Sequence, residues 1–401
     1  VGAVNATALA MVVPAPVLWL IHAAWDGTIT WRRAATTAAK TSVLCLGVSL
    51  WWIVMLIIQG RYGADVLAYS ESLKAVSFTS TSTEVTRGLG YWLFYVRDAY
   101  AATTTASIDH LASGRTILIG YFVVATGVVG LVFGRWQHRR FAALLFATGI
   151  VLGVGVHPID DPSPAMSLFV GDGEGGLALA LRSSTRAVPV MLLGLALGVA
   201  LLVSRVGTVR LPSVDASPRI LRVGTAAAIG VAAVVALPAL RTGGFVDPAL
   251  ERDQNPPAAW IDAADALDSR PAGYRVLQVP GTEFGAFQWG YTVDQPLPAL
   301  TERPLVTRDL LPLGSPAAMD LVFALDDRFQ TDTIEPEAVA AVSRFLGVDT
   351  IWVSGDVSYD RFRLARPEVV TDELTSQAAT AAGLVDAVPY GDPFVMASTI
   401  P

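Results

Sequence analysis

This chain of 401 residues is poor in charge, in cysteine and in histidine. Only 16% of its residues are Asp, Glu, Lys or Arg, whereas soluble domains carry roughly a quarter. The single cysteine, Cys45, excludes a disulfide framework and a multi-cysteine metal site. The four histidines leave little room for a histidine-rich metal centre. With 53% hydrophobic residues and a mean hydropathy of +0.50, much of the chain must avoid water.

The charges that are present are divided unevenly along the chain. Residues 1–240 hold 17 basic and 11 acidic side chains, whereas residues 241–401 hold 11 basic and 24 acidic ones. The overall formal charge of −7 argues against a nucleic-acid partner, which would need a basic surface. The two parts must therefore sit in different surroundings, and we expect the second to be water-exposed.

Six apolar stretches without any Asp, Glu, Lys or Arg predict helices that cross a lipid bilayer. About twenty apolar residues in a helix span the hydrocarbon core, and backbone polar groups must be satisfied within the helix there. The sequence therefore predicts a polytopic α-helical membrane protein with spans at residues 3–25, 42–59, 116–134, 141–159, 187–204 and 223–240.

Basic residues predict the orientation of these spans. The connections after the first, third and fifth spans carry ten basic and two acidic residues, and those after the second and fourth carry seven basic and nine acidic ones. By the positive-inside rule the first set is cytoplasmic. We therefore expect a multi-pass plasma-membrane protein whose outer loops and C-terminal part are extracytoplasmic.

The remaining segments divide into an outer loop, a linker and a folded tail. Residues 60–115 form a loop long enough to be functional, and within it residues 84–100 are predicted as an amphipathic helix at the membrane surface. Residues 241–257 are a polar linker containing prolines. In residues 258–401, helical and strand-like runs alternate, which predicts a small extracytoplasmic α/β domain. Its acids, including Asp320, Asp326 and Asp327, are expected on a solvated face.

Two polar groups in the outer loop are candidates for substrate binding. Arg61 and Glu71 could hold a sugar or a lipid phosphate, or they could simply anchor the loop at the interface, as Arg and Tyr often do. Glu84 and Arg87 lie one helical turn apart, and an ion pair between them is the simpler interpretation. Glu84 is otherwise a candidate general base if burial raises its pKa.

A third group lies before the fifth span. Arg182 and Arg186 are four residues apart, so a helix would place both on one face, and no acidic residue lies in that turn. Guanidinium groups suit bidentate phosphate contacts, so phosphate binding and interface anchoring are both open. His157, Asp160 and Asp161 are compatible with a metal but are more typical of a turn. Residues 171–176 (GDGEGG) only superficially resemble a phosphate loop.

Several short motifs follow one another in a recognisable order. They are residues 2–6 (GAVNA), 60–62 (GRY), 69–72 (YSES), 84–88 (EVTRG) with Trp92 and Tyr95, 181–186 (LRSSTR) with Pro189, 275–282 (RVLQVPGT), Gly285, 289–290 (WG) and 313–316 (LGSP). In order and spacing they resemble the actinobacterial α-(1→3)-arabinofuranosyltransferases, which are large polytopic glycosyltransferases of the GT-C class. The chain is expected to correspond to the C-terminal part of the membrane region of that family.

The resemblance implies transfer of arabinofuranose from a polyprenyl-phosphate donor to a cell-wall arabinan acceptor on the outer face of the plasma membrane. It implies that Arg182, Arg186 and Arg61 bind the donor phosphate. The substrate-groove candidates are Tyr69, Glu71, Arg87, Trp92 and Tyr95. The catalytic carboxylate of this class lies in the first outer loop, and because the chain begins at Val1 without an initiator methionine, we expect that residue upstream. No cofactor is predicted, and dependence on a divalent metal stays open.

This sequence departs from the family pattern before the fifth span. Thr185 stands where the family has His, Val188 where it has Asp, and Arg186 where it has Lys. The positive charge for phosphate is kept, but a hydrogen-bonding acid is lost. A non-catalytic scaffold or accessory subunit of cell-envelope polysaccharide assembly is therefore the alternative function. A transporter ranks third. Ion-coupled carriers commonly need charged residues within their spans, and the predicted spans contain none.

Overall fold

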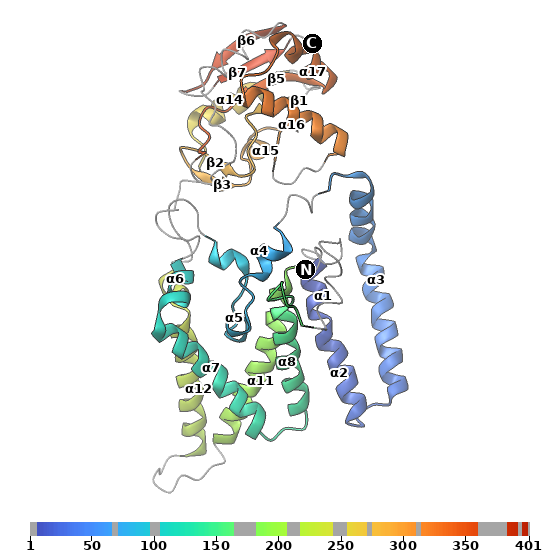
Figure 1. Ribbon diagram of the computed structural model, residues 1–401, viewed down its shortest axis with the longest axis vertical. Helices are drawn as coiled ribbons and strands as arrows, with labels where there is room; N and C mark the ends of the chain where they lie inside the picture. The colour runs from blue at the N-terminus through green and yellow to red at the C-terminus, as the bar shows by residue number, and fades with distance from the viewer. Residues whose placement is uncertain are drawn as a thin grey trace. The chain divides into compact units, whose positions relative to one another are not determined.

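A computed structural model describes residues 6–65, 71–96, 105–163, 182–206, 217–243, 255–270, 275–309, 314–359, 383–391 and 395–399. Internal contacts divide the chain into two compact units. The first holds the apolar helices up to residue 243, except for the end of the long helix α3, which groups with the second unit. The second unit holds the mixed helices and strands from residue 255 onward (Figure 1).

Within the described residues, five helices are long and apolar enough to cross a membrane, with mean hydropathies of 1.7 to 2.4. Two of them are composite: α1 is followed by α2 after a break at Val13, and the 3₁₀-helix η2 runs directly into α11. The helices are α1 (Ala6–Val12), α2 (Pro14–Trp25), α3 (Trp31–Tyr62), α7 (Gly114–Phe133), η2 (Ser184–Ala187), α11 (Val188–Val206) and α12 (Pro218–Ala236), followed by the short α13 (Ala239–Thr242).

The sequence predicted a sixth span at residues 141–159, and the structure places a shorter helix there. Helix α8 (Arg139–Val154) has 16 residues and ends at Gly155, whose φ of 57° lies in the left-handed region. At 1.5 Å per residue it is about 24 Å long, which is less than the roughly 30 Å hydrocarbon core. Among the residues that the structure describes, five apolar helices are therefore of full length, and α8 is a shorter helix beside them.

Glycines allow the central helices of the first unit to pack closely against one another. A Cβ added at Gly130 of α7 would lie 1.8 Å from the carbonyl oxygen of Gly198 on α11, so the two backbones are in direct contact. On the other side of α11, a Cβ at Gly194 would lie 2.5 Å from the backbone nitrogen of Phe146 on α8. Small residues allow such close approach between membrane helices. Helix α11 is thus the central helix, packed between α7 and α8 (Figure 1).

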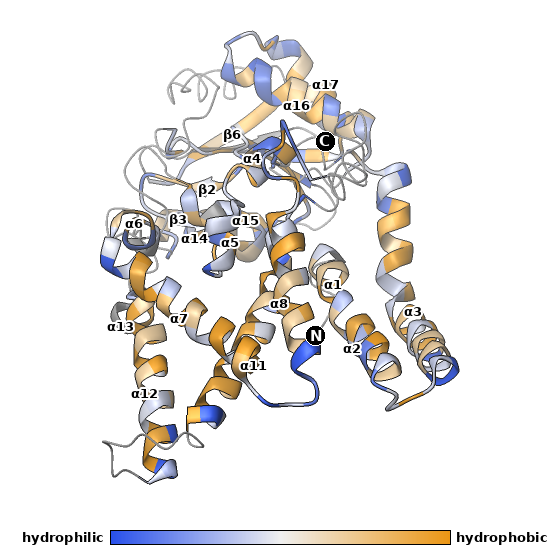
Figure 2. Ribbon diagram, turned by 60° about the horizontal axis from the view of Figure 1, so that its bottom comes forward, coloured by the Kyte–Doolittle hydropathy of each residue, from blue (hydrophilic) through white to orange (hydrophobic). Residues whose placement is uncertain are grey.

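Helix α3, unlike α11, is exposed rather than packed between other helices. Ala34 is its one buried residue, and its large apolar side chains are exposed along most of its length. Figure 2 colours much of this helix as hydrophobic. Its 32 residues correspond to about 48 Å of helix, which is longer than a bilayer core. An exposed apolar helix of this kind is stable in hydrocarbon rather than in water, as expected for the predicted span at residues 42–59.

Four short elements lie between α3 and α7. They are α4 (Leu73–Ser77), α5 (Ser82–Thr86), the 3₁₀-helix η1 (Trp92–Tyr95) and α6 (Thr105–Ala112). The prediction of one amphipathic helix over residues 84–100 is wrong, because the helical conformation ends after α5, where two glycines form a turn. Gly88 has a φ of 84° and Gly90 a φ of 97°, a conformation that glycine adopts without the steric cost other residues meet.

The first unit anchors α5 in its own core. Val85 is fully buried and packs in one cluster with Val124 of α7 and with Val188 and Met191 of α11. The hydroxyl of Ser80 just before it donates to the carbonyl oxygen of Val154 at the end of α8, at 3.0 Å. The segment from α4 to η1 is therefore packed against one end of the helix bundle.

The second unit is a sheet of five strands covered on both faces. Parallel β1 lies between β4 and β5, and antiparallel β7 and β6 extend the sheet in the order β4-β1-β5-β7-β6. A separate hairpin pairs β2 with β3. The strands are β1 (Arg275–Val279), β2 (Gly285–Ala286), β3 (Tyr291–Val293), β4 (Leu305–Val306), β5 (Val348–Val353), β6 (Leu384–Pro389) and β7 (Val395–Thr399).

The alternation of side chains along β1 explains the two layers of helices. Leu277 and Val279 point into a core with Phe329 and its neighbours from α16 (Pro316–Gln330) and α17 (Pro336–Phe345). Val276 points to the other face, into a core with Trp260 of α14 (Ala258–Asp268). The short α15 (Leu297–Leu300) completes that second layer.

The acids of α16 do not all face water as expected. Asp320 and Asp327 are exposed, but Asp326 is only 3% exposed. Its carboxylate accepts a hydrogen bond from the backbone N–H of Gly281 at 2.8 Å and lies 3.7 Å from Arg308. The prediction for Asp326 is wrong because this carboxylate is buried where it accepts the backbone N–H of Gly281, a residue 45 positions away in sequence.

Candidate functional site

Glu84 lies at the centre of a hydrogen-bond network built by α5, η1 and α6. Nη1 of Arg87 donates to one carboxylate oxygen of Glu84 at 2.9 Å, which confirms the predicted ion pair. The hydroxyl of Tyr95 donates to the other oxygen at 2.7 Å and accepts from the backbone N–H of Gly90 at 3.2 Å. Both carboxylate oxygens are therefore engaged by side chains of the same segment.

Arg87 is held from several sides. Its side chain is only 3% exposed, its Nη2 donates to the carbonyl oxygen of His110 at 3.0 Å, and its guanidinium carbon lies 5.8 Å from the centre of the Tyr121 ring. Burial lowers the pKa of His110, and the positive charge of Arg87 lowers it further. A neutral His110 is thus the form that best accompanies the buried arginine.

The same network fixes the protonation of Tyr95. Burial raises the pKa of the Tyr95 hydroxyl well above its usual value, and the hydrogen bond to the Glu84 carboxylate raises it further. Tyr95 therefore stays a hydrogen-bond donor. One oxygen of Glu84 accepts from Tyr95 and the other accepts from Arg87. This arrangement argues for a structural ion pair rather than a general base at Glu84.

The two arginines before α11 differ in their surroundings. Nη2 of Arg182 lies 3.4 Å from a carboxylate oxygen of Glu71, which is 111 residues away in sequence. The Arg182 side chain is 15% exposed and that of Glu71 is 37% exposed. An acidic partner for Arg182 therefore exists, although the sequence offers none within the same turn.

Arg186 has no such partner among the described residues. Its Nε is buried without a hydrogen bond, and the buried hydroxyl of the preceding Thr185 also lacks one within the described part of the chain. Buried polar groups in proteins are nearly always paired, so each exception calls for an explanation such as a bound ion or water. Thr185 and Arg186, neighbours in sequence, thus each have a donor without a partner among the described residues, and such donors could bind an anion.

The expectation that Arg182 and Arg186 share one helical face is wrong. Arg182 precedes the 3₁₀-helix η2, which contains Arg186. The backbone N–H of Ser184 donates to the carbonyl oxygen of Arg182 at 2.8 Å, and the Ser184 hydroxyl donates to that of Gly153 at 3.0 Å. This tight turn is seated on the end of α8, at Gly155, where a Cβ would lie 2.5 Å from the Ser184 hydroxyl oxygen.

The other predicted residues lie in different places. Arg61 is exposed in the last turn of α3, with its guanidinium carbon 5.7 Å from the ring centre of Tyr62. Trp92 is half-buried in η1, and its ring lies 6.1 Å from that of Tyr91. Tyr69 and residues 171–176 lie outside the described residues. The Nδ1–H of His157 donates to the carbonyl oxygen of Ser77 at 2.9 Å, so this side chain ties the turn after α8 to α4.

Sequence reasoning missed His110, Tyr121 and the spare hydroxyl of Thr185 as parts of this region. His110 and Tyr121 come from α6 and α7, and their contacts with Arg87 depend on the packing of these helices against α5. Thr185 differs from the family pattern, and that difference was the one signal in the sequence that pointed to it.

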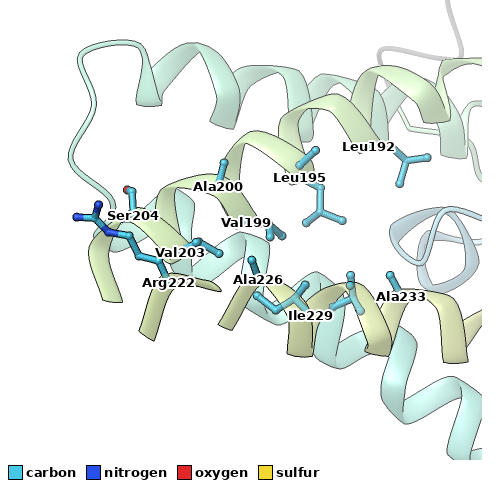
Figure 3. A pocket seen from close by; sticks show the side chains of 13 residues that line it. Leu192, Leu195, Val199, Ala200, Val203, Ser204, Arg222, Ala226, Ile229 and Ala233 are labelled. Carbon is cyan, nitrogen blue, oxygen red and sulfur yellow. The ribbon is translucent and has the colours of Figure 1, made fainter. Parts of the chain in front are cut away.

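An apolar groove of about 800 Å³ lies between α7, α11 and α12 (Figure 3). Its walls are aliphatic over most of their length, with Ser204 and Arg222 at one end and Leu192 and Ala233 toward the other. Such walls suit a hydrocarbon chain, as lipid-facing grooves between membrane helices do. The lining residues offer no pair of groups that could carry out acid–base chemistry.

The apolar helices of the first unit are typical of a polytopic membrane protein, and the second unit is a separate α/β fold. The sequence model of the family described as alpha-(1->3)-arabinofuranosyltransferase, N-terminal GT-C domain, matches residues 1–397. The chain belongs to this family. The expectation that it corresponds to the C-terminal part of the family's membrane region is wrong, because the matching model describes the N-terminal GT-C domain.

Two curated relatives carry the name alpha-(1->3)-arabinofuranosyltransferase. The protein from Mycolicibacterium smegmatis is 29% identical over 98% of this chain, and the one from Mycobacterium tuberculosis is 28% identical over 98%. The chain spans 27% and 28% of the lengths of these relatives, which is about a quarter.

Solved structures show the same fold. The cryo-EM structure of the mycobacterial arabinofuranosyltransferase AftD matches the whole of this chain with a TM-score of 0.62 at 22% identity, and this chain covers 26% of it. A mutant of that protein matches with a TM-score of 0.60 at 23% identity, with 28% of it covered. The GT-C fold with several membrane helices is thus shared, and membership of the family makes this chain part of a membrane protein.

Proposed function

We propose that this chain is the GT-C part of a membrane glycosyltransferase that transfers arabinofuranose to a growing arabinan. The donor is an arabinofuranosyl polyprenyl phosphate, the acceptor is a cell-wall polysaccharide, and the reaction takes place on the outer face of the plasma membrane. The family match over residues 1–397 supports the reaction class. The excess of basic residues in the connections after the first, third and fifth predicted spans supports the orientation.

The observation that carries the donor assignment is that, among the described residues, neither Nε of Arg186 nor the hydroxyl of Thr185 has a hydrogen-bond partner. A lipid phosphate would accept from both, and it would also neutralise the charge that Arg182 and Arg186 bring to one turn. In displacement at an anomeric carbon, the departing phosphate gains negative charge in the transition state, and fixed cationic donors stabilise it there. Arg186 is thus proposed to bind the donor and to stabilise the leaving group.

Glu71 has a supporting part in this proposal. Its carboxylate lies 3.4 Å from Arg182, so it can fix the direction of that guanidinium. The base that deprotonates the acceptor hydroxyl is not assigned to Glu84, because each of its oxygens already accepts a hydrogen bond, one from Arg87 and one from Tyr95. Arg61, exposed at the end of α3, is proposed as a second, peripheral contact for the anionic donor.

The test uses the full-length protein in membranes with a synthetic arabinofuranosyl polyprenyl phosphate. Charge-assisted hydrogen bonds contribute about 1.5–3 kcal/mol, so Arg186→Ala should raise the donor KM by roughly 10- to 100-fold. Arg186→Lys keeps the charge and should recover part of the loss. Arg32→Ala, at an exposed position at the start of α3, serves as the matched control. An unchanged donor KM in Arg186→Ala would remove the phosphate assignment.

A non-catalytic scaffold is the second candidate, and the departure at Val188 favours it. Where the family pattern has an acid, Val188 is 6% exposed and packs in the apolar cluster with Val85 and Val124. That position therefore serves packing here. The same assay separates the two functions, since a scaffold would give no transfer with the wild-type protein at any donor concentration.

A further inference from the structure

Two of the four histidines lie close together at the start of α8. The turn that contains Arg182 and Arg186 contacts the other end of this helix. Nε2 of His22, in the last turn of α2, lies 3.1 Å from Nδ1 of His138, the residue just before α8. The carboxylate of Asp26 joins them, and one ligand atom from each of the three residues lies within 4.8 Å of the others. His22 and Asp26 are four residues apart, so the end of α2 presents both on one face.

The hydrogen bonds of His138 prepare its Nδ1 to bind a cation. Its Nε2 lies 2.7 Å from the side-chain amide nitrogen of Gln137. Half a turn of this amide places its oxygen against the ring nitrogen instead, and Gln137 then accepts the Nε2–H of the ring. The neutral tautomer fixed in this way leaves a lone pair on Nδ1 directed at His22, as outer partners do for metal-bound histidines.

The rings are also held in place by packing. His22 is 4% exposed, its ring stacks on Phe141 with centres 6.0 Å apart, and the ring of Trp19 lies 5.0 Å from that of His138. Two nitrogens bound to one tetrahedral zinc ion are roughly 3.3 Å apart, close to the separation found here. Zinc accepts imidazole and carboxylate ligands together, whereas magnesium prefers oxygen alone.

We propose that His22, Asp26 and His138 bind a divalent transition-metal ion of the zinc type, which clips α2 to α8. A hollow of about 390 Å³ is lined by His22, Asp26 and Arg140 together with Trp25, Ala143 and Leu144, and it leaves room for a fourth ligand such as water. Arg140 adds positive charge there, so a bound ion is expected to keep an anionic fourth ligand. The clip ties the N-terminal helices to the α7–α8–α11 bundle, independently of the proposed transfer reaction.

The test measures Zn²⁺ binding to the full-length protein, purified through a tag without histidines and stripped with a chelator. Wild-type protein should bind one zinc ion at this site and show a higher Tm with zinc. His22→Phe keeps the stacking on Phe141, and Asp26→Asn changes an exposed side chain. Each should weaken zinc affinity at least about tenfold and remove the rise in Tm. Gln137→Leu should weaken it by roughly 10- to 100-fold, as loss of an outer partner does.

His157→Gln is the control, because His157 lies outside this cluster in the turn after α8. It should bind zinc like the wild type. Because Asp26 is exposed, Asp26→Asn is expected to fold normally, so it remains informative if His22→Phe does not fold. Two results would overturn the proposal: no zinc bound by the wild-type protein, or zinc affinity unchanged in Asp26→Asn and His22→Phe. Either one would leave a simple hydrogen bond between the two imidazoles.

Discussion

The hydroxyl of Tyr95 donates a hydrogen bond to Glu84 at 2.7 Å, and the turn between them contains two glycines with positive φ, Gly88 and Gly90. This contact closes a loop of eleven residues onto α5, whose Val85 is in turn buried in the helix bundle. The carboxylate that sequence reasoning considered as a base is therefore a structural acceptor. It holds η1 against α5, in the segment between α3 and α7.

This relationship predicts the effect of Glu84→Gln. The amide keeps one acceptor for Tyr95 but loses the charge that balances Arg87, whose side chain is buried. The variant should lose about 1–3 kcal/mol of stability, measured as a lower Tm in detergent. Its kcat should change little, whereas removal of a general base would lower kcat by about 10²–10⁴-fold.

Asp109→Asn is the matched control, because Asp109 is an exposed acid in α6, beside His110. It should leave both Tm and kcat unchanged. A hundredfold fall in kcat for Glu84→Gln, with Tm preserved, would return Glu84 to a catalytic role.

A second prediction concerns the contact between α7 and α11. Gly130→Ala would place a methyl group 1.8 Å from the carbonyl oxygen of Gly198, so the helices must separate. Overpacking of this kind costs about 1–3 kcal/mol, and a lower Tm is expected. Gly224→Ala in α12 meets nothing within 4 Å, so it should be neutral or stabilise by up to about 1 kcal/mol. Equal Tm values for the two variants would contradict the close packing.

A third prediction concerns pH and the second unit. The indole N–H groups of Trp260 and Trp289 both donate to one oxygen of Asp356 at 2.8 Å, yet burial raises the pKa of Asp356 above its usual value. The folded state therefore holds this proton more readily than the unfolded state does. The contribution of Asp356 to stability is greatest below its unfolded pKa and is lost as the pH rises through its folded pKa.

Asp356→Asn cannot titrate, so it should lack this loss. Thermal unfolding of the full-length protein between about pH 3 and pH 7 checks the sign: the Tm of the wild type should fall relative to that of Asp356→Asn as the pH rises. Asp320→Asn, at an exposed position on α16, should run parallel to the wild type. A wild-type Tm that rises relative to that of Asp356→Asn toward neutral pH would contradict the assigned direction.

Local sequence signals predicted most of the elements. The apolar runs at residues 116–134 and 187–204 lie within or closely overlap α7 and the η2–α11 helix. The alternation of helical and strand-like runs expected in residues 258–401 is found in α14, β1, α16, α17 and β5. These predictions succeeded because periodicity, helix-compatible prolines and charge-free length are all properties of neighbouring residues.

Features that depend on distant residues could not be predicted in this way. Glu71 and Arg182 are 111 residues apart, and nothing local to either one identifies the other. The turn at Gly88 and Gly90 overrode an apolar pattern that was consistent with a continuous helix. The strand order and the burial of Asp326 follow from tertiary pairing that a single sequence does not reveal.

The central claim is that the turn containing Arg186 binds the phosphate of a polyprenyl donor. The most direct measurement is a cryo-EM map of the full-length protein with polyprenyl phosphate bound. The account predicts phosphate density within hydrogen-bonding distance of the Arg186 guanidinium and the Thr185 hydroxyl, with Arg182 still paired to Glu71. Phosphate density elsewhere, with this turn unoccupied, would contradict it.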